Sequence, residues 1–246
     1  MRVLVHGISG HMGQIVARMA AEGVCGASLA GGVSPDVAVE ENGNFKSFFS
    51  CSADCDVVID FSFHGAVGEL LDYCVSRRIP VVVATTGHTE EEKALISQAA
   101  NTVPVFFSAN MSVGIAVTAE LARKAAAAFP GADIEIVETH HNRKVDVPSG
   151  TALLLADSIK SVRPQCVYNI GRPENGKRTA EEIGIHSLRL GNVVGIHEIL
   201  VSTGSETITL KHECHSRDLF AEGALRAAAF ICGKGPGLYN MKDIIG

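Results

Sequence analysis

The sequence predicts an α/β protein in which a doubly wound, parallel Rossmann-type sheet is joined to a second, α+β domain. Two changes of pattern along the 246 residues indicate this organisation. Up to about residue 110, short apolar runs alternate with segments of helical spacing, which is typical of a parallel sheet with helices on both faces. Further along, extended segments interrupted by glycine alternate apolar and polar residues, as strands with one covered face do.

Five apolar runs in the first part are expected to be strands. Each run contains little polar alternation, so we expect both of its faces to be buried. The runs are Val3–Val5, Ala27–Ala30, Val57–Ile59, Val81–Ala84 and Val105–Phe107.

The second part begins with an alanine-rich helix over about Ser112–Phe129, followed by a strand at Ile134–Val137. After a dense polar stretch, another helix is expected to start near Ser149. The segments between Val167 and Cys214 have period-two alternation, which predicts antiparallel strands with one face open to solvent or to another subunit. A last amphipathic helix, Asp218–Ala229, is expected to pack back on the first domain.

Composition and charge exclude several classes of function. Lys and Arg number 21 against 27 Asp and Glu, a net charge of −6, whereas a nucleic-acid-binding protein usually gathers a basic excess on one face. No apolar stretch approaches the roughly eighteen residues of a membrane span, and the start of the chain lacks the apolar centre of a signal peptide. We therefore expect no nucleic-acid partner, no membrane association and a cytoplasmic location. The seven scattered cysteines contain no Cys-x-x-Cys pair, which favours reduced structural thiols.

A glycine turn stands directly after the first predicted strand. It reads Gly7-Ile-Ser-Gly-His-Met-Gly13, and a helical pattern begins at once. Glycines at these places allow a sharp turn and a close approach of a pyrophosphate to the N-terminus of a helix. Ser9 occupies the place of the second glycine in the usual spacing, so a plain tight turn remains an alternative to a dinucleotide site.

The second predicted strand lacks, at its tip, the acidic residue that usually holds the ribose hydroxyls of a dinucleotide. Ser34 stands there, and the nearest acid, Asp36, is either that ribose ligand or a solvated loop residue. Two other strands end in polar residues, at Asp60–Ser62 and Thr85–Gly87. Ordinary turn and cap chemistry explains both, but their shared place at the carboxyl edge of a parallel sheet favours ligand binding.

The stretch from Glu138 to Thr151 is the most informative part of the chain. Adjacent residues of an extended segment point to opposite sides, so His140 and His141 face one small atom only if the chain turns between them. Two histidines that bind one metal ion need a common face, so we expect no metal here. A histidine titrates near neutrality and is able to pass a proton, and Lys144 supplies a positive charge or a second proton.

The same stretch ends at the start of a helix. Ser149 or Thr151 is expected to cap this helix, and the uncapped N–H groups of its first turn would bind a carboxylate-sized anion. Cationic side chains next to a helix N-terminus favour a pocket for a small acidic molecule.

With these residues the chain resembles the dihydrodipicolinate reductases of lysine biosynthesis, which are also named 4-hydroxy-tetrahydrodipicolinate reductases. The family signature Glu-x-His-His-x-x-Lys-x-Asp-x-Pro-Ser-Gly-Thr-Ala matches Glu138–Ala152 throughout. Four other segments have family counterparts in the same order, namely Gly7–Gly13, Ala84–Gly87, Ser108–Gly114 and Gly237–Asp243.

This resemblance implies reduction of a cyclic, unsaturated dicarboxylate to tetrahydrodipicolinate by NADPH or NADH, in the diaminopimelate and lysine pathway. It makes His140 the proton donor and acceptor, and Lys144 the second catalytic group. The substrate carboxylate would be bound by His141, Ser149, Gly150 and Thr151. The cofactor would be bound by Gly7, Ile8, Ser9, Gly10, His11, Met12, Ser34, Ala84, Thr85, Thr86, Ser108, Ala109, Asn110 and Met111.

The change of pattern near residue 110 and the return of the last helix predict a dinucleotide-binding domain formed by residues 1–111 with 216–246, and a second domain at 112–215. The resemblance makes this second domain the substrate-binding and oligomerisation domain. Family members are usually homotetramers joined through the sheet of the second domain, and we expect a homotetramer here. Three positions depart from the family. Ser34-Pro35 replaces an acid followed by a base, which leaves the choice between NADPH and NADH open, and His64 stands where the family usually has proline.

Two other classes of function stay open from the residues alone. A nicotinamide-sensing module without catalysis would bind the cofactor and leave it reduced. A metal-dependent hydrolase would use His140 and His141 together with the cluster Lys211–His215. The joint presence of His140, Lys144 and the Ser-Gly-Thr turn favours the reductase over both.

Overall fold

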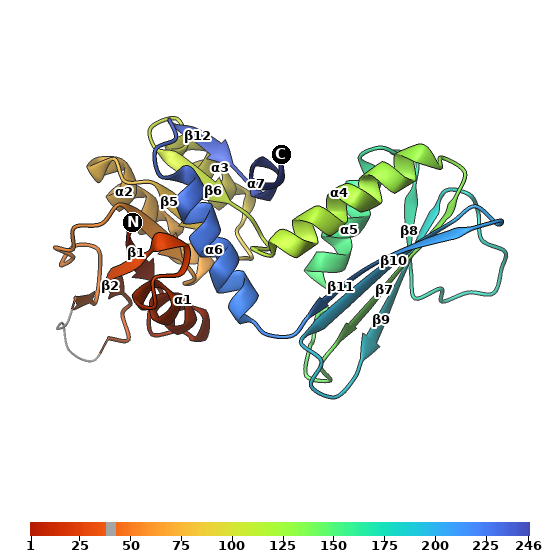
Figure 1. Ribbon diagram of the computed structural model, residues 1–246, viewed down its shortest axis with the longest axis horizontal. Coiled ribbons are helices and arrows are strands. Elements are labelled where there is room, and N and C mark those ends of the chain that lie inside the picture. The colour runs from red at the N-terminus through yellow and green to blue at the C-terminus, as the bar shows by residue number, and fades with distance from the viewer. Residues whose placement is uncertain (38–42) are drawn as a thin grey trace. The chain divides into compact units, whose positions relative to one another are not determined.

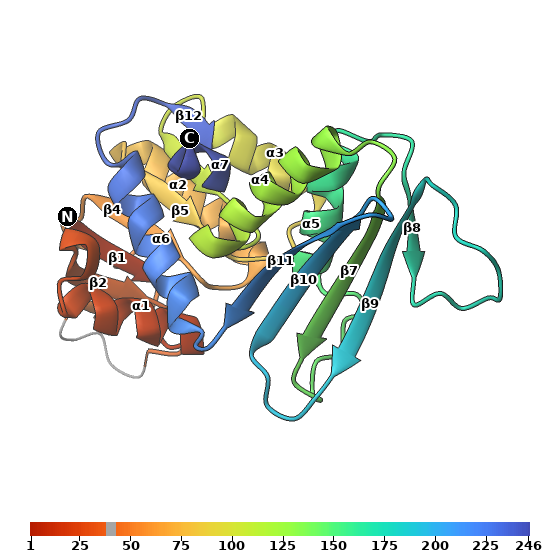
Figure 2. The ribbon, with the colours of Figure 1, turned by 45° about the vertical axis from the view of Figure 1, so that its right-hand side comes forward.

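The computed structural model describes residues 1–37 and 43–246. Within them the chain forms two compact units (Figures 1 and 2). The first unit contains Met1–Ser112 together with Asp218–Gly246, and the second contains Val113–Arg217. No helix among the described residues is long and apolar enough to cross a membrane.

The first unit is built on a sheet whose strand order is β12-β6-β5-β4-β1-β2-β3, with every neighbouring pair parallel. The five strands expected from the apolar runs are all present. The bounds are Arg2–His6 (β1), Ser28–Val33 (β2), Asn44–Phe45 (β3), Val57–Asp60 (β4), Val81–Val83 (β5), Pro104–Phe107 (β6) and Gly237–Tyr239 (β12). Strand order reverses at β1, which has β2 on one side and β4 on the other, so the carboxyl ends of β1 and β4 mark the switch point where such sheets bind ligands.

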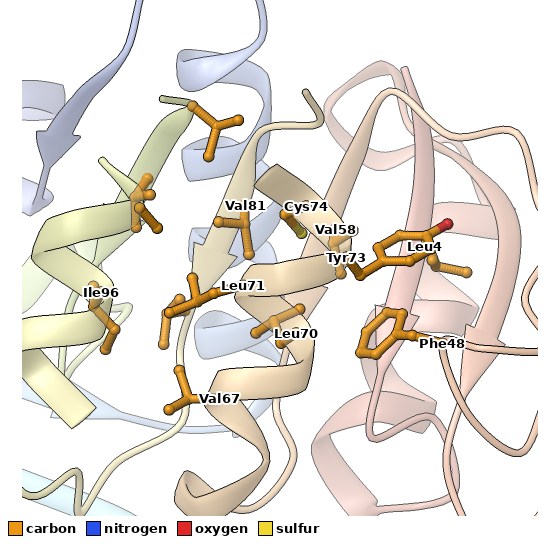
Figure 3. Close-up of a cluster of buried hydrophobic side chains, with 14 of the residues drawn as sticks. Leu4, Phe48, Val58, Val67, Leu70, Leu71, Tyr73, Cys74, Val81 and Ile96 are labelled. Atoms are coloured by element: carbon orange, nitrogen blue, oxygen red, sulfur yellow. The ribbon is translucent and has the colours of Figure 1, made fainter. Parts of the chain in front are cut away.

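Helices cover both faces of this sheet. On one face, α2 and α3 pack against Leu4, Val58 and Val81 (Figure 3). On the other face, α6 packs against β4, β5 and β6, and α1 lies beside α6. The helices are His11–Ala21 (α1), Val67–Arg77 (α2), Glu90–Ala99 (α3), Asp218–Ile231 (α6) and the short Met241–Ile245 (α7), with 3₁₀ turns at Val24–Gly26 (η1) and His64–Ala66 (η2). Burial of the sheet on both faces explains why its strands read as continuous apolar runs.

The second unit contains a mixed sheet of order β11-β10-β7-β9-β8, on which α4 and α5 pack. Its strands are Asp133–His140 (β7), Val167–Ile170 (β8), Glu182–Arg189 (β9), Gly195–Ser202 (β10) and Thr207–Cys214 (β11). Its helices are Val113–Ala128 (α4) and Gly150–Lys160 (α5). The core lies between the helices and isoleucines from three strands, including Ile136, Ile185 and Ile199, all fully buried.

The expectation that every strand between Val167 and Cys214 is antiparallel is wrong for part of the sheet. β10 runs antiparallel to β7 and β11, but β9 runs parallel to both β7 and β8. Between β7 and β8 the chain crosses over through α5, and the loop at 171–181 carries it back before β9. Alternation of apolar and polar residues reports a half-buried strand and carries no information on its direction.

Candidate active site

The glycine turn between β1 and α1 is shaped by close backbone contacts. Gly7 has φ +83°, and a Cβ atom there would lie 2.4 Å from the carbonyl oxygen of Phe61. A Cβ atom on Gly13 would lie 2.1 Å from the carbonyl oxygen of Gly7. Helix α1 begins after Gly10 with no side-chain cap, so N–H groups of its first turn stay available to an anion. These features fit the pyrophosphate of a dinucleotide.

Polar residues at the ends of β4 and β5 lie next to this turn. Asp60 ends β4 and is paired in register with His6, the last residue of β1. The backbone N–H of Ser62 donates to Thr85 Oγ1 at 2.9 Å, and the Ser62 hydroxyl donates to Asp60 Oδ1 at 2.6 Å. The ends of these strands therefore form one connected edge at the switch point.

A pair of hydroxyl groups stands where the usual fingerprint has a glycine and an acid. Ser34 follows β2 directly and is buried, and its Oγ lies 2.6 Å from Ser9 Oγ. Asp36, the other candidate for the ribose ligand, is exposed. The structure brings Ser34, not Asp36, into contact with the glycine turn.

The predicted segment after β6 continues the same edge of the sheet. The Ser108 hydroxyl donates to the carbonyl oxygen of Asn110 at 2.7 Å, and Asn110 Oδ1 accepts from the N–H of Ser112 at 2.8 Å. Met111 is buried against α6, because a Cβ atom on Gly223 would lie 1.7 Å from its carbonyl oxygen. Ala84 is held by a bond from its N–H to the Asp60 carbonyl at 3.0 Å. All predicted cofactor residues of this unit thus belong to segments at the carboxyl ends of its strands.

His64, the departure from the family pattern, also has a partner at this edge. Its Nδ1 lies 2.9 Å from both carboxylate oxygens of Glu92. Glu92 is the third residue of α3 and completes a capping box with Thr89. His88 is buried beside them, with its Nδ1 at 3.5 Å from the same carboxylate.

A second cluster lies in the second unit, at the carboxyl end of β7. Glu138 and His140 are two residues apart and so share one face of the sheet. The Glu138 side chain is fully buried and binds His140 Nδ1, while both of its oxygens accept from Arg189 at 3.0 Å. Burial raises the pKa of Glu138, but the hydrogen bonds from His140 and Arg189 outweigh it and bring the pKa to about 2. Glu138 is therefore a carboxylate at neutral pH.

His197 contacts His140, and Ser149 contacts His197. The rings of His140 and His197 meet edge to face with centroids 5.2 Å apart. Burial, together with the positive charges of His140 and Lys144, lowers the pKa of His197 to about 3. Its Nε2 lies 3.3 Å from Ser149 Oγ, which also accepts from the N–H of Ala152 at 3.2 Å. Of the two predicted caps, Ser149 is the one at the N-cap position of α5.

His141 and Lys144 lie on a turn that follows β7. The N–H of Lys144 donates to the His141 carbonyl at 3.1 Å, and Lys144 Nζ is 2.8 Å from the exposed Asp146 carboxylate. Burial lowers the pKa of His141, and the charges of Arg143 and Arg217 lower it further. Gly150 and Thr151 begin α5 and thus border the same cluster. The charges of Arg143, Arg217 and Lys144 thus all act on His141.

Three charged or titratable residues of this cluster were not predicted as site residues: Arg189, His197 and Arg217. Glu138 opens the signature but is not among the predicted site residues. The spacing Glu-x-His was a usable signal, because it places both side chains on one strand face. Arg189 and His197 come from β9 and β10, and only the strand register brings them to Glu138. Among the described residues, no group of three His, Cys, Asp or Glu side chains is arranged to hold a metal ion.

These two clusters and the fold define a class of protein. A Rossmann-type sheet with an open glycine turn is the framework of dinucleotide-dependent enzymes, and a separate group of imidazole and cationic side chains suits an anionic reactant. The class is that of the dinucleotide-dependent oxidoreductases.

Comparison with known proteins identifies the family. The family described as "Dihydrodipicolinate reductase, N-terminus" matches residues 1–111, and "Dihydrodipicolinate reductase, C-terminus" matches residues 114–245. The chain is 43% identical to a 4-hydroxy-tetrahydrodipicolinate reductase of Caldanaerobacter subterraneus subsp. tengcongensis, covering 99% of this chain and 98% of that protein. It is 42% identical to the protein of the same name in Clostridium tetani, covering 98% and 95%. The chain belongs to the dihydrodipicolinate reductase family.

Solved structures agree with this assignment. A structure titled "Dipicolinate bound Dihydrodipicolinate reductase from Paenisporosarcina sp. TG-14" matches with a TM-score of 0.83 and 26% identity over 99% of both chains. A probable dehydrogenase from Thermotoga maritima matches with a TM-score of 0.63 at 12% identity, covering 99% of this chain and 92% of that one, which shows the fold alone. The predicted fold class, family and reductase function are confirmed.

Proposed function

We propose that this chain reduces 4-hydroxy-tetrahydrodipicolinate, a cyclic dicarboxylate, to tetrahydrodipicolinate for diaminopimelate and lysine biosynthesis, with His140 and Lys144 as the catalytic residues. Family membership supports the reaction, and a relative whose structure is titled dipicolinate-bound supports a dicarboxylate as substrate. The single observation that carries the residue roles is the binding of His140 Nδ1 to Glu138, which leaves Nε2 as the ring nitrogen for the substrate.

The names of substrate and product fix the balance of the reaction. Replacing a hydroxyl by hydrogen requires one hydride and one proton, and the hydroxyl leaves as water. The reduced nicotinamide supplies the hydride when it is bound. His140 supplies the proton from Nε2 of its imidazolium form, and it is the titratable ring of the signature whose other nitrogen binds a carboxylate.

The substrate carboxylates require positive charge and N–H donors. Lys144 Nζ, which rests on exposed Asp146, is free to exchange that partner for a carboxylate of the substrate. The first turn of α5, at Gly150 and Thr151, would bind the second carboxylate, because the N-terminus of a helix favours an anion. His141 contributes a further donor beside them.

The cofactor proposal covers NADPH and NADH. The glycine turn of Gly7–Met12 would hold the pyrophosphate, Ser34 the ribose edge, and Ala84–Thr86 with Ser108–Met111 the remainder. Support comes from the open first turn of α1 and the close approach of Gly7 and Gly13. A homotetramer and a cytoplasmic location complete the proposal, in line with the family resemblance.

The test is an assay that follows the absorbance of NADPH and of NADH separately, with freshly generated substrate. We expect oxidation of at least one cofactor that depends on both enzyme and substrate. Cofactor binding measured by calorimetry, with no oxidation in the complete assay, would instead support the sensing module. A rate that disappears with chelator and returns with a divalent metal would contradict the assigned mechanism.

A further inference from the structure

Strand register gathers four side chains on the inner face of the second sheet. Glu138 and His140 occupy alternate positions of β7, Arg189 is the register partner of His140 on β9, and His197 is the register partner of Glu138 on β10. Toward the other end of β7, the same face carries Ile134 and Ile136, which are fully buried. The polar group therefore begins where the apolar core of the second unit ends.

The Glu138 carboxylate is surrounded by hydrogen-bond donors, among them the Ser187 side chain. It accepts from His140 Nδ1, from two nitrogens of Arg189 at 3.0 Å each, and from the N–H of Ser149 at 3.2 Å. A carboxylate has no proton to give, so the ring nitrogen facing it must carry one. In the neutral imidazole, Nδ1 is then protonated and Nε2 is an acceptor with a free lone pair.

We propose that the Arg189–Glu138 pair is a positioning device for His140, and that Gly195 keeps His140 Nε2 open to the substrate. The inference rests on the proposed function of His140 and deepens it. Glu138 fixes the tautomer and orientation of the ring, and Arg189 offsets the charge of Glu138. A Cβ atom on Gly195 would lie 3.1 Å from His140 Nε2, so the absence of a side chain there leaves space at that nitrogen.

Arg189 has a specific electrostatic effect. A lone buried carboxylate would strongly favour the protonated ring and hold the proton that His140 must deliver. The other titratable groups around His140 are His197 on β10, whose ring contacts it, and His141 on the turn after β7; the charge of Lys144 acts on both of these histidines. Arg189 is the cation bonded directly to the Glu138 carboxylate, so it sets how far that carboxylate stabilises the imidazolium.

The cost of burying these charges argues against a merely structural pair. Glu138 is fully buried and Arg189 keeps 19% of its side chain exposed. An ion pair with a buried member is commonly no more stabilising than apolar residues of similar volume, because the buried ion loses its hydration. The inner face of β7 already accommodates isoleucine at Ile134 and Ile136. Glu138 stands at the next position of that face, and its pairing with Arg189 is explained by the orientation and protonation that the pair gives to His140.

The first experiment measures the pH dependence of kcat and kcat/KM in three variants of the full-length enzyme. Activity should fall on the alkaline side of the pH profile, where His140 loses its proton; we call this side the alkaline limb. Glu138→Gln keeps a hydrogen-bond acceptor but removes the negative charge, so the alkaline limb should move to lower pH by about one unit or more. Arg189→Met leaves the carboxylate uncompensated, so the limb should move to higher pH. Arg189→Lys keeps the charge and should restore the wild-type limb. Each of the first two variants should lower kcat by about 10- to 100-fold, a part of what general acid catalysis contributes.

Opposite shifts from the two halves of one ion pair distinguish positioning from a structural role. If both variants lose activity without moving the limb, or move it in the same direction, the proposal is overturned. Thermal melting of each variant identifies any that fails to fold, and the measurements below do not depend on those variants.

The second experiment reads the tautomer directly. In wild-type protein labelled with ¹⁵N, the resonances of His140 are assigned by their absence in His140→Asn. We expect the neutral ring to carry its proton on Nδ1. A neutral ring that carries its proton on Nε2 would overturn the proposal. This readout needs no substrate, so it tests the inference even where the wild-type enzyme fails to oxidise a nicotinamide, an outcome that would sink the proposed function alone.

The third experiment tests the space at Nε2. Gly195→Ala should lower kcat/KM by about 10-fold or more while the tautomer and the pH limb stay as in the wild type. Gly131→Ala is the matched control in the same unit, because a Cβ atom there would meet nothing within 4 Å. Equal activity of the two alanine variants would show that Gly195 does not keep the nitrogen open.

Discussion

The two units build their sites from different parts of the chain. In the first unit the cofactor edge is shaped mainly by backbone: Gly7 and Gly13 matter because a Cβ atom has no room there. In the second unit the reactive group is held by buried side chains, with Glu138 bonded to His140 and Arg189. A substitution at the backbone site disrupts it by a steric clash. A substitution in the side-chain network removes a charge or leaves a hydrogen-bond partner unsatisfied. Substitutions in the two units should therefore affect stability, binding and catalysis differently.

The largest effect is expected in the second unit, at Lys144. Lys144→Ala removes the cation that we assign to substrate charge and proton transfer, so kcat/KM should fall by about 10²- to 10⁴-fold. Cofactor affinity should stay nearly constant, because the predicted cofactor residues belong to the first unit. Steady-state kinetics and calorimetry with NADPH and NADH measure the two quantities.

Lys124→Ala is the control for that substitution. Lys124 lies on α4 of the same unit, with 67% of its side chain exposed, and its replacement should leave kinetics and binding as in the wild type. Equal loss of activity and of cofactor affinity in Lys144→Ala would contradict the division of roles between the units.

The next effect concerns the backbone site. Gly13→Ala places a Cβ atom 2.1 Å from the Gly7 carbonyl oxygen, so the turn must shift. We expect a loss of about 1–3 kcal/mol in the free energy of unfolding, the usual cost of forcing an extra carbon into a packed site, together with weaker cofactor binding. Gly68→Ala, in α2 of the same unit, meets nothing within 4 Å and should be neutral or stabilising. Urea unfolding of both variants measures the free energy of unfolding. Similar losses in the two variants would show that the glycine turn is no more sterically restricted than α2.

The difference between the units also explains what the sequence revealed. Five strands of the first unit, the glycine turn and a cap at Ser149 or Thr151 were predicted because each depends on residues that are close in the chain. The short strands β3 and β12 were not predicted. Arg189 and His197 were missed because their position beside Glu138 depends on register between strands far apart in sequence. The direction of β9 was predicted wrongly for the same reason, since alternation specifies a face and leaves the pairing open.

A smaller effect should sharpen the comparison within the cofactor edge. Ser34→Asp restores an acid at the tip of β2, where Ser34 Oγ now contacts Ser9 Oγ at 2.6 Å. The added carboxylate repels the 2′-phosphate of NADPH and accepts a hydrogen bond from the 2′-hydroxyl of NADH. The ratio of NADH to NADPH affinity should therefore rise by about 10-fold. Asp36→Asn is the control, because Asp36 is exposed and should not affect the ratio. If Asp36→Asn changes the ratio and Ser34→Asp does not, Asp36 is the residue that binds the ribose of the cofactor.

The smallest effect compares one helix cap from each unit. Thr89 caps α3 through the N–H of Glu92, and Ser149 caps α5 through the N–H of Ala152, both at 3.2 Å. Replacing either by alanine should cost about 1 kcal/mol of stability, the usual value for a cap. Ser149 is buried and also contacts His197 Nε2, so Ser149→Ala should cost more than Thr89→Ala and should raise the KM for substrate as well. Chemical denaturation and steady-state kinetics of the two variants decide the matter: equal costs, with KM unchanged in both, would mean that the second unit's cap serves only its helix.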